Sequence, residues 1–259
     1  MSEQIGKDKI EKDKIYNCDC LEGMKHIPNA SIDAIICDLP YGTTANKWDS
    51  IIPLDLLWEQ YKRVIKRGAP IVLFAQCPFD KVLGVSNLDW LKYEWVWYKN
   101  QVTGYLNANY APMRVHEVVL VFSELAAAPS ADPMLYNPQK IKGAVRVHNH
   151  KAGANGNNYG FAKATKVVTD EECPRDVIAF DRDADSFHPT QKPVDLLRYL
   201  IRTYSNEGDT ILDNCMGSGT TAVACIKEKR HFIGFELNAD YFAKACKRID
   251  AERRQLSLF

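Results

Sequence analysis

Two glycines near the end of the chain lie in a pattern that can bind a nucleoside-containing cofactor. Gly217 and Gly219 belong to the stretch Asp213-Asn-Cys-Met-Gly-Ser-Gly-Thr-Thr-Ala222, between a predicted strand and a predicted helix, where the backbone can approach a ligand closely. Glu236 ends the next predicted strand, 17 residues after Gly219, so its carboxylate can accept hydrogen bonds from two ribose hydroxyls. The stretch almost matches the dinucleotide-binding pattern G-x-G-x-x-A.

The same glycines have a simpler interpretation, because a turn from a strand into a helix often needs glycine whatever it binds. The position of Glu236 favours the cofactor. The phosphate-binding pattern G-x-x-x-x-G-K-[ST] is absent, and no lysine directly follows Gly219. Hydrolysis of a nucleoside triphosphate is therefore not expected.

A second candidate, Asp38-Leu39-Pro40-Tyr41, directly follows a mainly apolar run at residues 32–37. This pattern is typical of a strand that ends in a turn, although Asp38 could be a capping residue and Tyr41 an ordinary core residue. Only 23 residues follow Glu236, too few for the strands that a nucleotide-binding sheet requires. The upstream strands must complete that sheet, so we expect the two motifs to share one cleft.

The hydrophobic periodicity predicts alternating strands and helices around these two turns. Strands are expected at residues 32–37, 71–75, 93–98, 115–122, 210–213 and 231–235, and helices at 54–65, 78–85, 193–204, 219–229 and 239–254. Such alternation favours an α/β fold with a doubly wound, mostly parallel sheet.

Residues 124–187 interrupt this regularity and are rich in Asn, Gly, Ala, Lys and His, so we expect an inserted region there. Between Pro133 and Thr169 there is no Asp or Glu, and 37 residues carry a charge of +6. The basic residues are Lys140, Lys142, Arg146, Lys151, Lys163 and Lys166. Lys and Arg can contact phosphates while Asn, Gln and His read base edges, although a merely solvated loop is an alternative.

The composition, 46% hydrophobic and 25% charged over 259 residues, describes a globular chain with a full core. The longest uncharged, mainly apolar run has 11 residues, short of the roughly 20 that a membrane-spanning helix needs. Residues 1–17 offer no apolar stretch for a signal peptide, so a cytoplasmic protein is expected. The 33 basic and 33 acidic residues cancel, which argues against nucleic-acid binding over the whole surface.

The eight cysteines are scattered over the chain, several within apolar segments, and we expect them to be reduced and mostly buried. His148, His150 and Cys173 lack the C-x-x-C or H-x-x-x-H spacing of a zinc site. No metal is expected.

Together the two motifs resemble those of a known enzyme family. Asp38-Leu39-Pro40-Tyr41 is similar to the D-P-P-Y catalytic motif of S-adenosylmethionine-dependent amino methyltransferases, and residues 213–221 are similar to their cofactor motif D-P-F-x-G-S-G-T-T. The order, with the catalytic motif first, a basic variable segment next and the cofactor motif last, resembles the β group of DNA amino methyltransferases. The resemblance spans most of residues 16–250 and includes residues 17–24, 114–122 and 188–193. Leu39, Asn214 and Cys215 depart from the family pattern, where Pro, Pro and Phe are usual.

The resemblance implies a Rossmann-like methyltransferase domain with an inserted target-recognition region. Residues 1–123 would form its catalytic half, 124–187 the insert, and 188–259 the cofactor-binding half. The Asp38 carboxylate and the Leu39 carbonyl would accept the two hydrogens of the substrate amine, Pro40 would shape the loop, and Tyr41 would stack on a base extruded from the duplex.

The resemblance also implies residues that bind S-adenosylmethionine. Asp19 would bind the adenine end and Glu236 the ribose, and Lys192 would lie at the edge of the pocket. The methionine part and the loop would involve Asp213, Gly217, Ser218, Gly219, Thr220 and Thr221. The basic residues of the insert would contact the DNA.

The function implied is transfer of a methyl group to adenine N6 in double-stranded DNA. Cytosine-N4 methylation is the nearest alternative, since both substrates present an amine to the same acceptors, but family members that act on cytosine more often begin the motif with serine. Two further alternatives are a nicotinamide-dependent oxidoreductase, suggested by the glycine pattern, and a DNA-binding module that binds the cofactor without catalysis. A homodimer and a cognate restriction enzyme are the other partners considered.

Overall fold

The computed structural model describes residues 10–42, 49–150, 165–183 and 190–256. These form two compact units, a large one that includes the chain up to Asn137 and from Asp176 onward, and a small one at Pro138–Arg175. The predicted insert, 124–187, is wider than the small unit. Met134 and Ile178 are buried in the core of the large unit, so both flanks of the predicted insert contribute to it.

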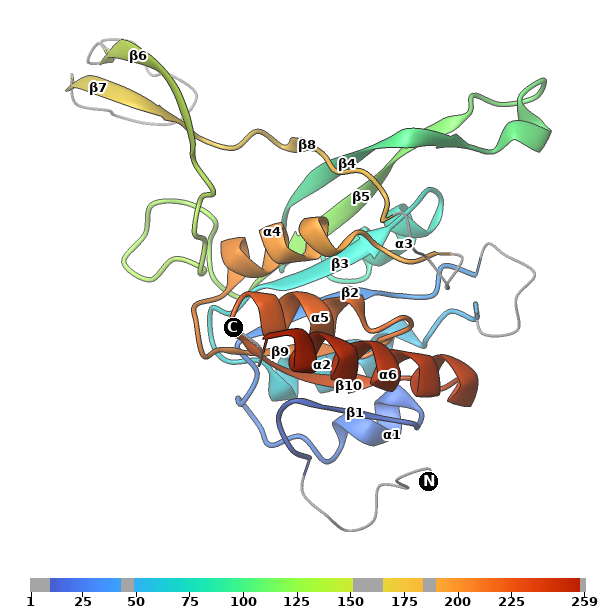
Figure 1. Cartoon of the computed structure of the whole chain (residues 1–259). Helices are drawn as coiled ribbons and strands as arrows, with labels where there is room; N and C mark the ends of the chain where they lie inside the picture. The colour runs from blue at the N-terminus through green and yellow to red at the C-terminus, as the bar shows by residue number, and fades with distance from the viewer. Residues whose placement is uncertain (1–9, 43–48, 151–164, 184–189, 257–259) are drawn as a thin grey trace. The chain divides into compact units, whose positions relative to one another are not determined.

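The large unit contains an eight-stranded sheet with the order β1-β10-β9-β2-β3-β5-β4-β8 (Figure 1). Its strands are β1 (Lys14–Tyr16), β2 (Ala34–Asp38), β3 (Ile71–Ala75), β4 (Leu91–Thr103), β5 (Arg114–Phe122), β8 (Val177–Ala179), β9 (Thr210–Asp213) and β10 (His231–Phe235). The first five strands of this order are parallel, and β5 is antiparallel to both of its neighbours. The predicted doubly wound, mostly parallel sheet is confirmed.

In the described residues, six α-helices cover the two faces of this sheet. They are α1 (Cys20–Met24), α2 (Leu54–Val64), α3 (Phe79–Val85), α4 (Val194–Tyr204), α5 (Thr220–Lys227) and α6 (Ala239–Leu256). Side chains of β2 alternate between two hydrophobic clusters: Ile35 and Cys37 pack on the side of α1, α2 and α3, whereas Ala34 and Ile36 pack on the side of α4, α5 and α6. This alternation is expected for a strand that is covered on both faces.

The chain reverses its winding direction between β2 and β9. From β2 it continues through α2 to β3 on one side, and from β9 through α5 to β10 on the other. β2 and β9 are neighbours, with Ala34 opposite Ile211 and Ile35 opposite Leu212. Open α/β sheets bind their ligands outside the carboxyl ends of the strands at such a point. Asp38 and Asp213 end these two strands.

The small unit is an antiparallel pair of strands, β6 (Ile141–His150) and β7 (Thr165–Glu172). Lys142 lies opposite Glu171, and Lys140 forms an ion pair with Glu171 at 2.9 Å. Acidic residues therefore neutralise part of the positive charge at this end of the pair.

All eight cysteines have free thiols, and three of them, Cys20, Cys37 and Cys225, are buried. The prediction of reduced cysteines agrees with this structure, but the prediction that most are buried is wrong, because two are exposed and three are only partly buried. Among the described residues, no helix is both long and apolar enough to cross a membrane.

Candidate active site

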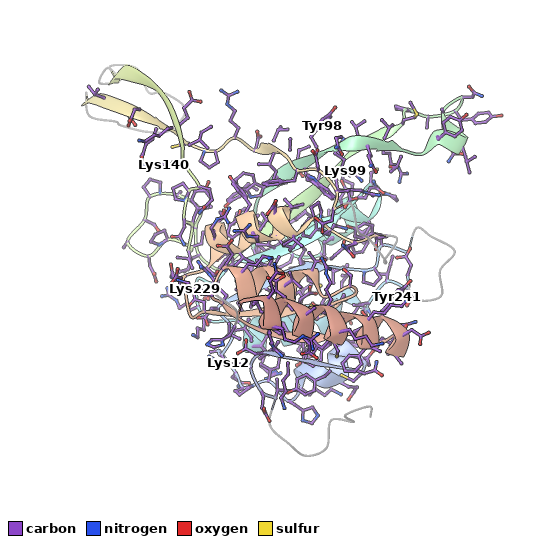
Figure 2. The ribbon with its side chains drawn as sticks, in the orientation of Figure 1. Lys12, Tyr98, Lys99, Lys140, Lys229 and Tyr241 are labelled. Carbon is purple, nitrogen blue, oxygen red and sulfur yellow. The ribbon has the colours of Figure 1, made fainter. Side chains whose placement is uncertain are left out.

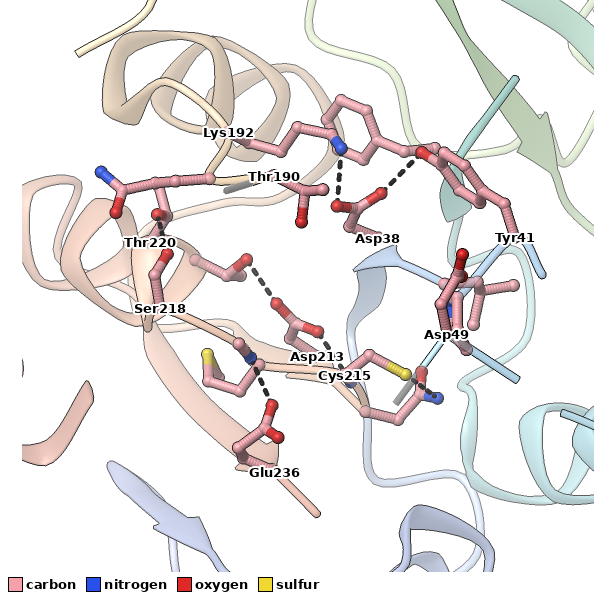
Figure 3. A pocket seen from close by; sticks show the side chains of 18 of the residues that line it. Asp38, Tyr41, Asp49, Thr190, Lys192, Asp213, Cys215, Ser218, Thr220 and Glu236 are labelled. Atoms are coloured by element: carbon pink, nitrogen blue, oxygen red, sulfur yellow. Dashed lines mark hydrogen bonds and ion pairs between the residues drawn. The ribbon is translucent and has the colours of Figure 1, made fainter. Parts of the chain in front are cut away.

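A cavity of about 560 Å³ opens where β2 and β9 end, and both sequence motifs line it (Figure 3). The predicted residues among its lining are Asp19, Asp38, Leu39, Pro40, Tyr41, Lys192, Asp213, Gly217, Ser218, Thr220, Thr221 and Glu236. Gly219 is the one predicted cofactor residue outside the lining. The prediction of one shared cleft is confirmed, whereas the role of each residue remains a prediction.

Asp38 holds its carboxylate at the end of β2 with both oxygens engaged. Oδ1 accepts a hydrogen bond from the Tyr41 hydroxyl at 2.6 Å, and Oδ2 accepts one from Lys192 Nζ at 2.6 Å. A quarter of the side chain is exposed. Burial raises the pKa of Asp38, and the Lys192 ammonium opposes that rise. The carboxyl group therefore lies next to two hydrogen-bond donors, Tyr41 and Lys192, and most of it is shielded from solvent.

Lys192 and Asp38 belong to a cluster of four charged residues that also contains Glu117 and Lys99. Lys192 Nζ lies 3.2 Å from Glu117 Oε2, and Lys99 Nζ lies 2.6 Å from Glu117 Oε1. The Lys99, Glu117 and Lys192 side chains are each 10% exposed or less. We call these four residues the buried charge cluster; its two carboxylates and two ammonium groups balance. Such groups remain charged in a protein interior only when they are paired.

The pKa values within the buried charge cluster follow from this pairing. Burial acts to raise the pKa of Glu117, but the ammonium groups of Lys192 and Lys99 outweigh it and lower that pKa to about 2. Burial acts to lower the pKa of Lys192, but Asp38 and Glu117 outweigh it and raise that pKa. Lys192 is therefore a stable cation between two carboxyl groups.

The Tyr41 ring contacts Phe79 and Lys192, and its hydroxyl contacts Asp38. Its ring stacks on Phe79 with centroids 5.6 Å apart, and Lys192 Nζ lies 5.7 Å from its centroid. Burial raises the pKa of the Tyr41 hydroxyl well above its usual value, so this group donates to Asp38 as a neutral phenol. Stacking of Tyr41 on a base remains a prediction.

The glycine turn between β9 and α5 is held by two carboxylates. Asp213 accepts hydrogen bonds from Cys215 N at 3.0 Å and from the Thr221 hydroxyl at 2.6 Å. Glu236 accepts one from Gly217 N at 2.8 Å and one from Asn238 N at 2.7 Å. Each carboxylate oxygen has two lone pairs, so Glu236 retains acceptor capacity toward the cavity. Burial raises the pKa of Asp213 to about 6.

Arg248 of α6 supports the same turn from outside the cavity lining. It donates to Ser218 O at 3.2 Å and to the Thr220 hydroxyl at 2.8 Å, and the hydroxyls of Ser218 and Thr220 are 2.9 Å apart. The sequence reasoning missed Arg248, because its only signal was a basic residue on a charged helix.

Both predicted glycines have backbone conformations that disfavour other residues, with φ of +52° at Gly217 and +77° at Gly219. We expect Gly219→Ala to lower the free energy of unfolding by about 2–3 kcal/mol, since a left-handed alanine is strained and its Cβ would lie 3.2 Å from Ala245 Cβ. Gly208 is the matched control, because its φ is +84° and a Cβ there meets nothing within 4 Å. Gly208→Ala should cost only about 1 kcal/mol. Urea denaturation measures both, and equal losses would contradict the steric argument.

Asp19 caps the short helix α1, accepting hydrogen bonds from Leu21 N at 2.9 Å and Glu22 N at 3.1 Å. It also lines the cavity. The capping contacts account for the residue type by themselves, so contact with the cofactor remains a prediction.

The three residues that differ from the motifs, Leu39, Asn214 and Cys215, each contact neighbouring parts of the structure. The Tyr61 hydroxyl donates to Asn214 Oδ1 at 2.5 Å. Asn214, in place of the usual proline, thus ties the turn after β9 to helix α2. The Cys215 Sγ accepts a hydrogen bond from Asn214 Nδ2 at 3.5 Å. Leu39 is 4% exposed and packs in the hydrophobic core.

The six predicted DNA-binding residues belong to the small unit or lie outside the described residues. Lys142 is exposed, and Lys140 is paired with Glu171. Arg146 lies on β6 and Lys166 on β7, whereas Lys151 and Lys163 lie outside the described residues. Within the part of the chain that the structure describes, no group of three His, Cys, Asp or Glu side chains could hold a metal ion.

Comparisons with known proteins agree with this geometry. M.HpaI, a type II methyltransferase of Haemophilus parainfluenzae, is 28% identical over 250 residues, which cover 90% of this chain and 72% of that protein. The DNA adenine methyltransferase YhdJ of Escherichia coli strain K12 is 27% identical over 261 residues, covering 93% of this chain and 83% of that one.

Two solved structures share the fold. The M1.HpyAVI complex with SAM has a TM-score of 0.60 and 23% identity, covering 91% of this chain and 98% of that one. PvuII DNA methyltransferase, which is cytosine-N4-specific, has a TM-score of 0.65 and 15% identity, covering 93% of this chain and 87% of that one. A family model described as a DNA methylase matches residues 32–247. Because this match spans most of the chain, the protein belongs to the DNA methylase family, whose members are amino methyltransferases of the adenine-N6 and cytosine-N4 type.

Proposed function

We propose that this protein transfers a methyl group from S-adenosylmethionine to adenine N6 in double-stranded DNA. The observation that carries the proposal is the Asp38 carboxylate, which lines the same cavity as the glycine turn and Glu236. An exocyclic amine on adenine is a poor nucleophile, because its lone pair is delocalised into the ring. Hydrogen-bond acceptors beside the amine favour the geometry in which that lone pair can attack.

The cavity residues fit the cofactor. Family members take the methyl group from S-adenosylmethionine, which supplies it on a positively charged sulfur. Glu236 has lone pairs left for two ribose hydroxyls, and the cavity volume of about 560 Å³ lies in the usual range for binding sites of this ligand size. Asp213 fixes the turn through Cys215 N and Thr221.

Lys192 has a different role in this proposal from the one that the sequence suggested. Its ammonium donates to Asp38 Oδ2, the kind of bond that the substrate amine would make there. The entering amine takes over this bond, and Lys192 remains paired with Glu117. The buried charge cluster thus keeps Asp38 ionised before the base arrives and leaves an acceptor free when it does.

The nitrogen would gain a fourth bond as the bond between the methyl group and the cofactor sulfur breaks, with that electron pair remaining on sulfur as a neutral thioether. The nitrogen must then release one hydrogen as a proton. Asp38 Oδ2 is the acceptor beside it. Because burial raises the pKa of Asp38, this carboxylate takes up a proton more readily than an exposed aspartate would. The Leu39 carbonyl would accept the second amine hydrogen, while Pro40 shapes the loop and Tyr41 stacks on the extruded base.

Adenine is favoured over cytosine by Asp38 at the first position of the motif and by similarity to YhdJ, which is named an adenine methyltransferase. The test is incubation with methyl-labelled S-adenosylmethionine and unmethylated duplex DNA, followed by nucleoside mass spectrometry. N6-methyldeoxyadenosine is the expected product. N4-methyldeoxycytidine would establish the cytosine alternative, and no transfer despite cofactor binding would favour a non-catalytic module. Membership of the DNA methylase family leaves no support for the oxidoreductase alternative.

Glu236→Ala is expected to raise the Kd for S-adenosylmethionine about 10- to 100-fold, because two hydrogen bonds to ribose are lost at roughly 1 kcal/mol or more each. The Gly217 N–H also loses its acceptor, which loosens the turn. Isothermal titration calorimetry with the cofactor and with adenine alone distinguishes the effects. Affinity for adenine, which has no ribose, should change little, and an equal loss for both ligands would contradict the ribose contact.

Double-stranded DNA is the proposed macromolecular substrate, and the basic residues of the small unit are proposed to contact it. Lys142 and Arg146 would bind phosphates or base edges there. M.HpaI and M1.MboII are named type II methyltransferases, which supports a cognate restriction enzyme as a partner. A homodimer is a further proposal that light scattering in solution tests.

A further inference from the structure

The hairpin formed by β4 and β5 extends beyond the rest of the sheet (Figure 1). β5 pairs with β3 only from Val118 onward, and β8 pairs with β4 only as far as Tyr98. Beyond these positions the two strands pair with each other alone within the described residues, and their ends are joined by residues 104–113. We call residues 99–116 the outer hairpin.

The tip of the outer hairpin exposes large apolar and aromatic side chains (Figure 2 shows them beyond Tyr98 and Lys99). Tyr105 is 80% exposed, and Leu106 and Tyr110 are each 91% exposed. Val102 and Met113 are about half exposed. Solitary exposed apolar residues are ordinary, but a group of five on one short element is typical of an interaction surface.

Backbone hydrogen bonds hold the tip of the outer hairpin in its conformation. Asn107 N donates to Gly104 O at 3.0 Å, Tyr110 N to Asn107 O at 2.9 Å, and Ala111 N to the same oxygen at 3.0 Å. Gly104 supplies the left-handed turn with φ of +88°. The tip is therefore formed in advance, with its aromatic rings free to contact a partner.

The charge of this segment differs from that of the chain as a whole. Residues 95–116 contain no Asp or Glu, although the protein has 33 of them in 259 residues. Lys99 is buried and paired with Glu117, so the exposed cation of the outer hairpin is Arg114. Four exposed carboxamide side chains accompany it, Asn100, Gln101, Asn107 and Asn109. Positive charge, carboxamides and apolar tips are the combination that binds DNA: cations approach phosphates, amides read base edges, and apolar wedges enter base steps.

The outer hairpin begins at the rim of the active-site cavity. Lys99 and Thr103 line that cavity, and Arg114 donates to Oε1 of Gln76, another lining residue, at 2.9 Å. A duplex that delivers an extruded base to Asp38 must lie against this rim, so it comes within reach of the tip.

We propose that the outer hairpin is a DNA-contacting wedge, whose tip residues Tyr105, Leu106 and Tyr110 insert at the base steps beside the extruded nucleotide. The inference rests on the proposed function, because it takes the duplex to be the substrate. A second copy of the chain is the other occupant that exposed apolar side chains suit. The absence of acidic residues favours DNA, since a self-association surface has no reason to exclude them.

The test is the triple variant Tyr105→Ser, Leu106→Ser, Tyr110→Ser, with Val82→Ser, Val85→Ser, Leu88→Ser as the matched control, since those three apolar side chains are also exposed. Binding to a fluorescein-labelled fragment of unmethylated plasmid DNA is measured by anisotropy. We expect the tip variant to bind DNA at least about 10-fold more weakly, because base stacking and wedge contacts are lost. Its Tm and its Kd for S-adenosylmethionine should match those of the native protein.

Unchanged DNA affinity in the tip variant would overturn the proposal. If light scattering showed a native dimer that the tip variant dissociates, with DNA affinity retained, the surface would instead join two copies. An equal loss of DNA affinity in the control would also count against a specific wedge. Failure of the proposed function is distinguishable, because a native protein that binds DNA without methylating it still allows the binding comparison.

Discussion

Replacing Asp38 by asparagine is expected to lower kcat for methyl transfer about 10³-fold, while the Kd for S-adenosylmethionine changes less than about threefold. Removing one correctly placed hydrogen-bonding group from a reacting centre has an effect of this size. An amide at Asp38 Oδ2 also places a donor against the donor of Lys192, 2.6 Å away, and against the substrate amine. Single-turnover methylation of DNA with labelled cofactor measures the rate, and calorimetry measures the affinity.

Asp55→Asn is the control for this prediction, because Asp55 is exposed in the first turn of α2. It should leave both the rate and the affinity unchanged. A variant Asp38→Asn that retained a tenth or more of the native rate would show that Asp38 is not the essential acceptor. Loss of cofactor binding in that variant would instead place Asp38 in the cofactor site.

The central strands and helices could be predicted from the sequence, because most of them are apolar segments bounded by glycine or proline. The sequence could not indicate the short elements β1, α1 and β8. β8 has three residues and exists because Val177, Ile178 and Ala179 pair with β4, and α1 has five residues and depends on its Asp19 cap. Elements of only three to five residues have no readable period.

The pair β6 and β7 was missed for a related reason. Its strands are joined by residues 151–164 rather than by a two-residue turn, so the hairpin signal of a short glycine loop is absent. In addition, charged and polar residues on both strands hide the alternation that would indicate a buried face.

The candidate site was predictable where residues are adjacent in sequence and not where they meet through the sheet. Glu117 gave one signal, as a lone carboxylate in the apolar run 115–122. Its partners depend on register: β4 brings Lys99 near it because Trp97 lies opposite Glu117, and Lys192 comes from 75 positions further along the chain. No local pattern encodes such a meeting. The role of Lys192 was therefore assigned to the cofactor, whereas the structure places its ammonium on Asp38.

The buried charge cluster gives the second large effect. Lys192→Met is expected to lower the free energy of unfolding by about 3–5 kcal/mol, the range for breaking a buried ion pair, because Asp38 and Glu117 lose the cation between them. Glu117→Gln should cost less, since Lys192 keeps Asp38. The double variant restores charge balance within the cluster, so its loss should fall short of the sum by about 1–3 kcal/mol. Urea denaturation of the four proteins measures this coupling.

The same variants should move the pH dependence of kcat in opposite directions. In the proposed mechanism Asp38 must be ionised, so we expect the rate to fall as the pH drops through the pKa of Asp38. Lys192 lowers that pKa and Glu117 raises it. Lys192→Met therefore moves the acidic limb to higher pH, and Glu117→Gln moves it to lower pH.

Lys62→Met, an exposed substitution on α2, is the control for these profiles and should leave the acidic limb in place. A cluster that only stabilises the fold would lower the amount of active enzyme in both variants without moving the limb in either. Shifts in the same direction would contradict the assignment of the limb to Asp38. Opposite shifts would identify Asp38 as the group whose ionisation controls the reaction, with Lys192 and Glu117 as the residues that set it.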